Sequence, residues 1–132
     1  MELNYRIGHR PHTQDIIELY TSAGLRRPVE DAERIGKMYD NSNLIVSVYH
    51  EGKLVGVARS VTDYCYCCYL SDLAVKEEYK KEGIGKRLIE LTREKLGAEV
   101  TLILLSAPRA MEYYPKVGFE KIENGFIIHR SV

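Results

Sequence analysis

Basic residues and two glycines stand together where the middle of the chain changes from a strand pattern to a helix pattern. The segment reads Lys80-Lys81-Glu82-Gly83-Ile84-Gly85-Lys86-Arg87, with four basic residues and one acidic residue. A helix start has unpaired backbone N–H groups and a partial positive charge, and glycine lets a ligand approach that backbone closely. The segment therefore predicts a site for phosphate or pyrophosphate.

Two familiar nucleotide motifs do not match this segment. A P-loop needs Gly where Lys80 stands and Ser or Thr where Arg87 stands. A dinucleotide fingerprint needs a third Gly where Leu88 stands. The alternative to a phosphate site is a solvated charged loop with ordinary glycine turns.

The elements that must position this segment follow from hydrophobic periodicity and from turn residues. Strands are predicted at 3–7, 44–49, 54–61, 64–75, 100–105, 119–122 and 126–130, the last two joined by a turn at Asn124-Gly125. Helices are predicted at 13–23, 28–39 (with Pro28 as first residue), from Gly83-Gly85 to about Leu96, and 108–116. The order β-α-α-β-β-β-α-β-α-β-β contains one right-handed parallel crossover. It predicts an α/β (α+β) fold: a mixed, mostly antiparallel sheet of six to seven strands with helices on both faces.

Composition narrows the class of protein further. The 132 residues are 45% hydrophobic and carry 19 basic and 19 acidic residues. This predicts a single domain over residues 1–132 and excludes disorder and a uniformly basic nucleic-acid binder. We expect no membrane association, because no apolar run approaches the ~20 residues of a spanning helix. The three clustered cysteines, without histidine at ligand spacing, predict no metal site and a cytoplasmic setting.

Two motifs carry a resemblance to a known family. The run Leu70-Ser71-Asp72-Leu73-Ala74-Val75, followed by Lys80-x-x-Gly83-x-Gly85, resembles the acetyl-CoA-binding region of the GNAT (GCN5-related) N-acetyltransferases. The family signature there is Arg or Gln, two residues, Gly, one residue, and Gly or Ala. The run from Ala110 to Phe119, AMEYYPKVGF, resembles the family segment A-x-x-F-Y-x-K-x-G-F. The predicted order of elements also resembles the GNAT fold over essentially the whole chain.

The resemblance implies a cofactor site and a mechanism. The fourth strand would splay from the fifth, so that the backbone of Leu73, Ala74 and Val75 binds the pantetheine arm of acetyl-CoA. An N–H near Leu73 would polarise the thioester carbonyl, and Tyr114 would protonate the departing CoA thiolate. The pyrophosphate would be held by the following segment, whose residues are Lys80, Lys81, Glu82, Gly83, Ile84, Gly85, Lys86 and Arg87.

The chain departs from the family pattern at three places. Lys80 stands where the family has Arg or Gln. Lysine keeps the positive charge of arginine but lacks its planar guanidinium group. Ala107 replaces an asparagine found in many members. Tyr69 and Ser71 stand where other members place a base, and neither is basic at neutral pH. Asp72 is predicted to be a structural hydrogen-bond acceptor, because strand alternation puts it on the opposite face from Tyr69 and Ser71. We name no base and expect a water relay or capture of a neutral amine.

The resemblance also implies an acceptor pocket. Arg26 and Arg27 lie between the first two helices, where the family often builds this pocket, and they could bind a carboxylate or phosphate. Tyr69 and Ser71 are further candidates for this pocket. The alternative for the arginine pair is a solvated interhelix turn.

The sequence therefore favours an acetyl-CoA-dependent N-acetyltransferase that acts on the primary amine of a small acceptor by direct attack. One alternative is a non-enzymatic acyl-CoA-binding or regulatory module on the same fold. Another is acetylation of a protein or an aminoacyl-tRNA. The expected partners are acetyl-CoA and a small amine, without nucleic acid. The resemblance also allows a homodimer through the last strands.

Overall fold

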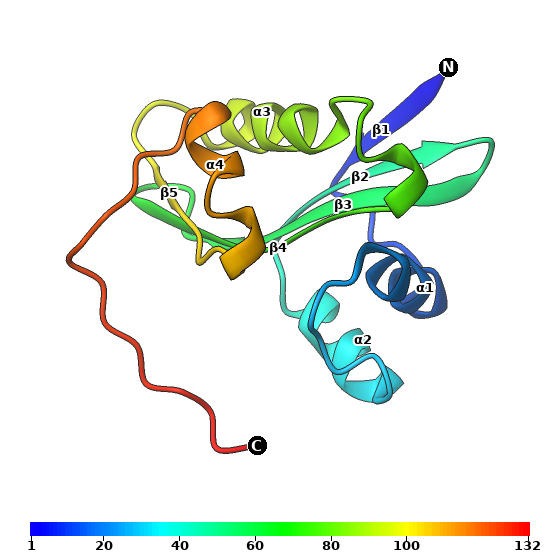
Figure 1. Ribbon diagram of the computed structural model, residues 1–132, viewed down its shortest axis with the longest axis horizontal. Coiled ribbons are helices and arrows are strands. Elements are labelled where there is room, and N and C mark those ends of the chain that lie inside the picture. Colours follow the sequence, from blue (N-terminus) through cyan, green and yellow to red (C-terminus); the bar gives the residue numbers. More distant parts are fainter.

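The computed structural model describes residues 1–132 and contains one five-stranded sheet in the order β1-β2-β3-β4-β5 (Figure 1). The strands are β1 (Leu3–Ile7), β2 (Leu44–His50), β3 (Lys53–Thr62), β4 (Cys67–Val75) and β5 (Thr101–Ile103). Neighbours from β1 to β4 are antiparallel, whereas β5 runs parallel to β4. The parallel crossover predicted between the fourth and fifth strands is confirmed.

Helices cover both faces of this sheet (Figure 1). The α-helices are α1 (Thr13–Ala23), α2 (Ala32–Asp40), α3 (Ile84–Leu96) and α4 (Tyr113–Lys116), and the 3-10 helices are η1 (Glu77–Tyr79) and η2 (Pro108–Ala110). α1 and α2 lie on one face, and α3 and α4 lie on the other. The mixed α/β fold class is therefore confirmed. None of the helices is long and apolar enough to cross a bilayer.

Each face of the sheet has its own hydrophobic core. Ile84, Leu88 and Ile89 of α3 are fully buried against the strands, where each such side chain contributes about 1.5–3 kcal/mol. A Cβ at Gly56 of β3 would lie 2.8 Å from Val48 and 3.1 Å from Ile84, so the absent side chain lets α3 approach the sheet closely. On the other face, the core comes mainly from α1 and α2: Ile16, Leu19, Tyr20, Ile35 and Tyr39.

Two element boundaries differ from the prediction because side chains cap the backbone. α2 begins at Ala32 rather than Pro28, because the Asp31 carboxylate accepts a hydrogen bond from the Arg34 N–H at 3.1 Å. β4 begins at Cys67 rather than Tyr64, because the Asp63 carboxylate accepts hydrogen bonds from the N–H groups of residues 65, 66 and 67. These bonds lower the pKa of Asp63 to about 2 and hold a turn before the strand.

The predicted C-terminal hairpin is absent, and this part of the prediction was wrong. Residues 120–132 form no strand and make no backbone hydrogen bond, and they run away from the body as an extended segment (Figure 1). The tight Asn124-Gly125 turn requires positive φ at both residues. Neither residue has positive φ here, so the turn stays open. The sheet consequently has five strands rather than six to seven.

Candidate functional site

The central feature of the site is the separation of β4 from β5. The two strands pair only at Cys67 with Thr101, Cys68 with Leu102 and Tyr69 with Ile103. β4 continues to Val75 and pairs there with β3 alone. From Leu70 to Val75, the edge of β4 that faces away from β3 therefore lacks a partner strand, and it can accept an extended ligand.

The direction of each backbone group along this edge follows from one hydrogen bond. The Lys76 N–H donates to the Val55 carbonyl at 2.8 Å, so Lys76 faces β3. Residues in an antiparallel pair alternate between facing their partner and facing away. Ala74 therefore faces β3, whereas Leu73 and Val75 present their N–H and C=O groups to the open edge. Of the three residues that the sequence suggested for the pantetheine arm, two have free backbone groups.

A bulge in β4 changes which side chains share a face. Arg59 pairs with Asp72 and Ser60 pairs with Leu70, which leaves Ser71 as an extra residue. The predicted alternation is therefore wrong at this point. Asp72 lies on the same face as Ser71, whose Oγ donates a hydrogen bond to Asp72 Oδ1 at 3.0 Å. Tyr69 also faces this side, because its neighbours Cys68 and Leu70 belong to the α3 core.

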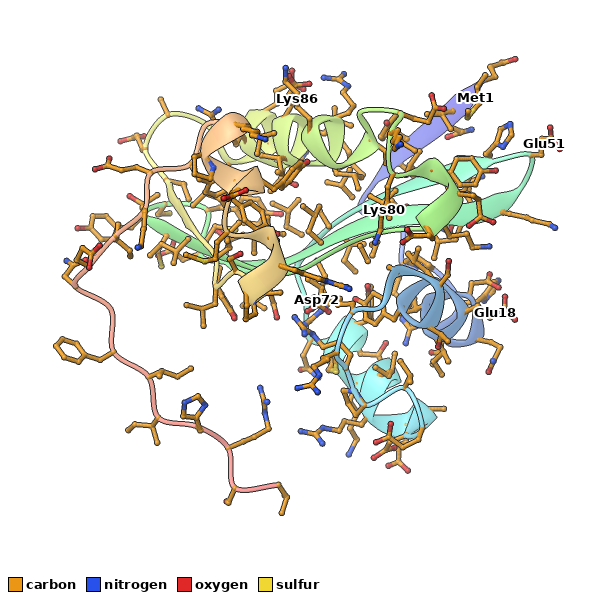
Figure 2. All side chains as sticks on the ribbon, viewed as in Figure 1. Met1, Glu18, Glu51, Asp72, Lys80 and Lys86 are labelled. Atoms are coloured by element: carbon orange, nitrogen blue, oxygen red, sulfur yellow. The ribbon has the colours of Figure 1, made fainter.

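Asp72 is the centre of a buried polar network. Its carboxylate has no exposed surface, and it accepts hydrogen bonds from Arg27 Nε and Arg59 Nε, both at 2.7 Å, and from the Tyr20 hydroxyl at 2.6 Å. Figure 2 shows Asp72 between the sheet and the α1–α2 layer. Burial raises the pKa of Asp72, but the two guanidinium groups outweigh it and hold that pKa below its usual range. Asp72 is thus an ionised structural acceptor, as predicted.

Arg27 connects this network to the bulge. Its Nη2 donates to the Ser71 carbonyl at 2.7 Å, in addition to the bond from Nε to Asp72. Arg27 is therefore held against β4 rather than in a solvated turn. The neighbouring Arg26 side chain is exposed, and its carbonyl accepts a hydrogen bond from Arg27 Nη1. Tyr69 is also partly exposed. Of the four acceptor-pocket candidates, Arg27 and Ser71 are brought together.

The predicted phosphate segment lies at the exposed start of α3. Gly83 is the N-cap with a φ of +72°, and no side chain caps the helix. Lys81, Lys86 and Arg87 are exposed around the free N–H groups of the first turn. This combination suits a phosphate group. Lys80 points elsewhere, because its ammonium binds the Ala23 carbonyl at 3.2 Å and Glu77 Oε2 at 2.9 Å.

The Tyr113 hydroxyl lies directly against this helix start. A Cβ at Gly85 would be 2.6 Å from the Tyr113 oxygen and 4.0 Å from a methyl group of Val75. Glycine at position 85 therefore leaves the space that the tyrosine hydroxyl fills. The same close approach brings α4, the start of α3 and the end of β4 together.

We predict that Gly85→Ala raises the KM for acetyl-CoA by about tenfold, equivalent to ~1.4 kcal/mol of binding. The added methyl group displaces Tyr113 and crowds the helix start, whereas alanine itself favours the helix. Steady-state kinetics over a range of acetyl-CoA concentrations measures this effect. Gly36→Ala is the matched control, because a Cβ there meets only ordinary contacts at 3.5 Å. Equal KM values for the two variants would contradict the prediction.

Tyr114 is positioned by the motif that contains it. Gly118 has a φ of +103°, which turns the chain so that the Phe119 N–H donates to the Tyr114 carbonyl at 3.1 Å. The Phe119 ring then packs edge-on against the Tyr114 ring, with centroids 5.5 Å apart. The Tyr114 hydroxyl makes no hydrogen bond within the chain, and burial raises its pKa. The phenol is therefore protonated at neutral pH and available as a proton donor.

Sequence reasoning missed two residues that organise the site, Arg59 and Arg109, and left Tyr20 open between the acceptor pocket and the core. Arg59 and Tyr20 bind Asp72, and Arg109 of η2 donates to the carbonyls of Ala23 at 3.2 Å and Gly24 at 2.8 Å. The signal for Arg59 was a lone charge within an apolar strand, which indicates a buried partner. Arg109 gave no such signal, because its contact lies 86 residues away in the sequence.

Comparison with known proteins identifies the family. The sequence pattern described as the acetyltransferase (GNAT) domain matches residues 18–129. The chain belongs to this family, and the resemblance seen in its two motifs is confirmed.

Individual relatives agree with this assignment. The GCN5-related N-acetyltransferase 2, chloroplastic, of Arabidopsis thaliana is 35% identical over 77 residues, or 57% of this chain. The chain spans 30% of the length of that protein and no more than about two thirds of several other curated relatives.

Solved structures share the fold. A probable acetyltransferase from meticillin-resistant Staphylococcus aureus matches with a TM-score of 0.83 and 22% identity, covering 98% of this chain and 100% of that one. An aminoglycoside N-acetyltransferase in complex with CoA matches with a TM-score of 0.73 and 14% identity, covering 99% and 96%.

Proposed function

We propose that this domain transfers the acetyl group of acetyl-CoA to a primary amine on a small acceptor. The observation that carries the proposal is the open edge of β4 at Leu73 and Val75, which ends next to the uncapped start of α3. Membership of the acetyltransferase (GNAT) family supports this proposal.

Each part of acetyl-CoA has a matching feature in the proposal. The amide groups of the pantetheine arm pair with the backbone of Leu73 and Val75, as an added strand would. The pyrophosphate lies at the N-terminus of α3, within the basic segment from Lys80 to Arg87. There the free N–H groups and the exposed Lys81, Lys86 and Arg87 supply positive charge.

The proposed chemistry is a direct attack. The lone pair of a neutral amine forms a bond to the thioester carbon, and the Leu73 N–H stabilises the negative charge that develops on the carbonyl oxygen. Collapse of this intermediate breaks the carbon–sulfur bond. The departing thiolate takes the proton of the Tyr114 phenol, the extra proton on nitrogen passes to water, and the phenolate is reprotonated from solvent.

Asp72 does not serve as the base in this scheme. Its carboxylate is fully buried and already accepts hydrogen bonds from two guanidinium groups. A carboxylate held ionised in this way is a poor proton acceptor. The amine therefore arrives neutral or loses its proton through water, and the rate should rise with pH as the acceptor amine deprotonates.

The acceptor reaches the thioester from the side of Arg27, Ser71 and Tyr69 in this proposal. Arg27 has 26% of its side chain exposed although it binds Asp72, so it can also face a ligand. Arg26, which is exposed beside it, adds charge that could attract an acidic group on the acceptor. The free cysteines Cys65, Cys67 and Cys68 support a reducing compartment such as the cytoplasm.

Release of CoA thiol, measured with acetyl-CoA and a panel of amines, tests the proposal. The panel contains amino acids, polyamines, aminosugars, aminoglycosides, peptides with free amino groups and an aminoacyl-tRNA. We expect thiol release that depends on one class of small amine, and a raised Tm with acetyl-CoA alone. A raised Tm without amine-dependent release would favour a regulatory acyl-CoA-binding module. An unchanged Tm at saturating acetyl-CoA would contradict both.

A further inference from the structure

The helices α1 and α2 cover only one end of their face of the sheet. Val57 of β3 and Ala74 of β4 pair with each other and are buried beneath these helices. The next residue of β3 on this face is Arg59, which binds the buried Asp72. The residue after that on the same face, Val61, is 47% exposed. Figure 1 shows α1 and α2 beneath the part of the sheet away from β5. The covered part of this face therefore ends at Arg59 and Asp72.

Three apolar side chains form a row across the uncovered part of this face. Val61 of β3 pairs with Tyr69 of β4, and Tyr69 pairs with Ile103 of β5. Paired residues of neighbouring strands share a face of the sheet, so the three side chains lie side by side. They are 41–47% exposed, whereas the residues on either side of Tyr69 belong to the α3 core. We call Val61, Tyr69 and Ile103 the apolar stripe. It offers a binding surface to the apolar part of a ligand.

A guanidinium group with free N–H groups lies next to the stripe. Two residues along β4 from Tyr69, the Ser71 carbonyl accepts a hydrogen bond from Arg27 Nη2. A guanidinium group has five N–H groups, and Arg27 uses three of them, on Asp72, Ser71 and Arg26. Two N–H groups and the exposed 26% of the side chain remain for a ligand. The matching ligand group is a carboxylate, which forms charge-assisted hydrogen bonds with guanidinium groups.

The stripe, the guanidinium group and the proposed thioester position follow one another along β4. Residues of a strand rise by about 3.3 Å each, so Tyr69, Ser71 and Leu73 follow at intervals of roughly 7 Å or less. An α-amino acid carries its side chain, its carboxylate and its amine on a single carbon atom. Such a molecule can therefore contact the stripe, Arg27 and the thioester beside the Leu73 N–H at the same time.

The charges of this site disfavour acceptors with several ammonium groups. Among the apolar stripe, the Arg26–Arg27 pair and the network around Asp72, the only carboxylate is Asp72 itself. It has no exposed surface and is already bound to two guanidinium groups. Polyamines and aminoglycosides would thus place their unreacted ammonium groups beside positive charge, which costs binding energy. Charge complementarity selects an acceptor with an apolar body and one acidic group instead.

We propose that the acceptor is an α-amino acid with an apolar side chain, of the phenylalanine or leucine type; this inference rests on the proposed acetyl transfer. The carboxylate of the acceptor binds Arg27, and its side chain lies on the apolar stripe. Its neutral amine forms a bond to the thioester carbon, and the carbon–sulfur bond of acetyl-CoA breaks. The thiolate takes the proton of Tyr114, and the extra proton on nitrogen passes to water. The products are an N-acetyl amino acid and CoA.

Release of CoA thiol with four matched acceptors tests both contacts. L-Phenylalanine has both recognised groups, phenethylamine lacks the carboxylate, glycine lacks the side chain, and spermidine carries several ammonium groups. We expect kcat/KM for L-phenylalanine to exceed that for each of the others by about tenfold or more. Because Arg27 also holds Asp72, this series tests the carboxylate contact on the acceptor rather than on the protein. A higher value for spermidine, or equal values for L-phenylalanine and phenethylamine, would overturn the proposal.

Ile103→Thr tests the apolar stripe. It should lower the ratio of kcat/KM for L-phenylalanine to that for glycine about fivefold, because it removes an apolar contact of roughly one methylene group. Ile7→Thr is the matched control, because Ile7 is 45% exposed and ends the strand at the opposite edge of the sheet. An equal ratio in the two variants would overturn the proposal. A lower mass of Ile103→Thr in light scattering, with unchanged selectivity, would place a second copy on the stripe and would also overturn it.

Calorimetric titration of L-phenylalanine into the protein saturated with CoA separates this inference from the proposed transfer. We expect binding in this titration and thiol release in the assay with acetyl-CoA. Binding without thiol release from any amine would support the acceptor site and contradict the transfer. Thiol release with another class of amine, without binding of L-phenylalanine, would overturn the acceptor class alone. The absence of both binding and thiol release would overturn both proposals.

Discussion

Replacing Tyr114 with phenylalanine should lower kcat for acetyl transfer by about 10²-fold or more, the usual contribution of a positioned general acid. The substitution removes only the hydroxyl, and the ring contacts with Phe119 and Tyr113 at 5.5 and 5.3 Å are kept. The KM for acetyl-CoA should therefore stay unchanged. Steady-state kinetics with saturating amine separates the two parameters.

The pH dependence of kcat provides an independent readout of the same residue. Burial raises the pKa of Tyr114 above its ordinary value of about 10. The donor is then protonated below that pH, so wild-type kcat should show no falling limb from this group before pH ~10. Tyr113→Phe is the matched control, and we expect it to affect the KM for acetyl-CoA more than kcat. Full turnover by Tyr114→Phe would remove Tyr114 from the mechanism.

Replacing Asp72 with asparagine should have the largest effect on folding stability. The substitution leaves the Arg27 and Arg59 guanidinium groups without their carboxylate, and removing one partner of a buried ion pair costs about 3–5 kcal/mol. A loss of this size corresponds to a fall in Tm of roughly 10 °C or more. Denaturant unfolding measures it directly.

A surface ion pair supplies the control for Asp72. Asp40→Asn breaks the exposed pair between Arg10 and Asp40, which should contribute only about 0–1 kcal/mol. A change of less than 1 kcal/mol for Asp72→Asn would contradict the assignment of Asp72 as the centre of the network. We also expect a raised KM for the acceptor amine in Asp72→Asn, because Arg27 would no longer be fixed against the Ser71 carbonyl.

The pH dependence of stability follows from the sign of the Asp72 shift. The folded-state pKa of Asp72 is below its usual value. Between the two pKa values the unfolded chain therefore binds more protons than the folded chain. The contribution of Asp72 to stability is fully present above its ordinary pKa of about 4, and it is lost as the pH falls through the lower pKa of the folded state. Asp72→Asn should remove this part of the acid sensitivity.

The central elements were predictable from sequence because their signals are local. The helix over 13–23 and the helix start at Gly83 are set by apolar spacing and by glycine. The separation of β4 from β5 was predicted from the resemblance to the family motif. In the structure, pairing between these two strands ends at Tyr69. Tyr114 was found in the same way, from the residues that surround it.

The remaining features depend on contacts between distant parts of the chain. The bulge at Ser71 reverses side-chain alternation, and its stabilisation by Arg27 joins residues 44 positions apart. The Asn124-Gly125 pair has the composition of a hairpin turn, but a turn closes only if its flanking strands find partners. Local composition does not show whether such a partner is within reach.

Amide hydrogen exchange along β4, measured residue by residue with and without acetyl-CoA, tests the central claim most directly. The open edge predicts strong additional protection of the Leu73 and Val75 amides on binding. Ala74 should change little, because its backbone already faces β3. The contradicting result is unchanged protection of Leu73 and Val75 under conditions in which acetyl-CoA binds. It would show that the cofactor does not lie on this edge.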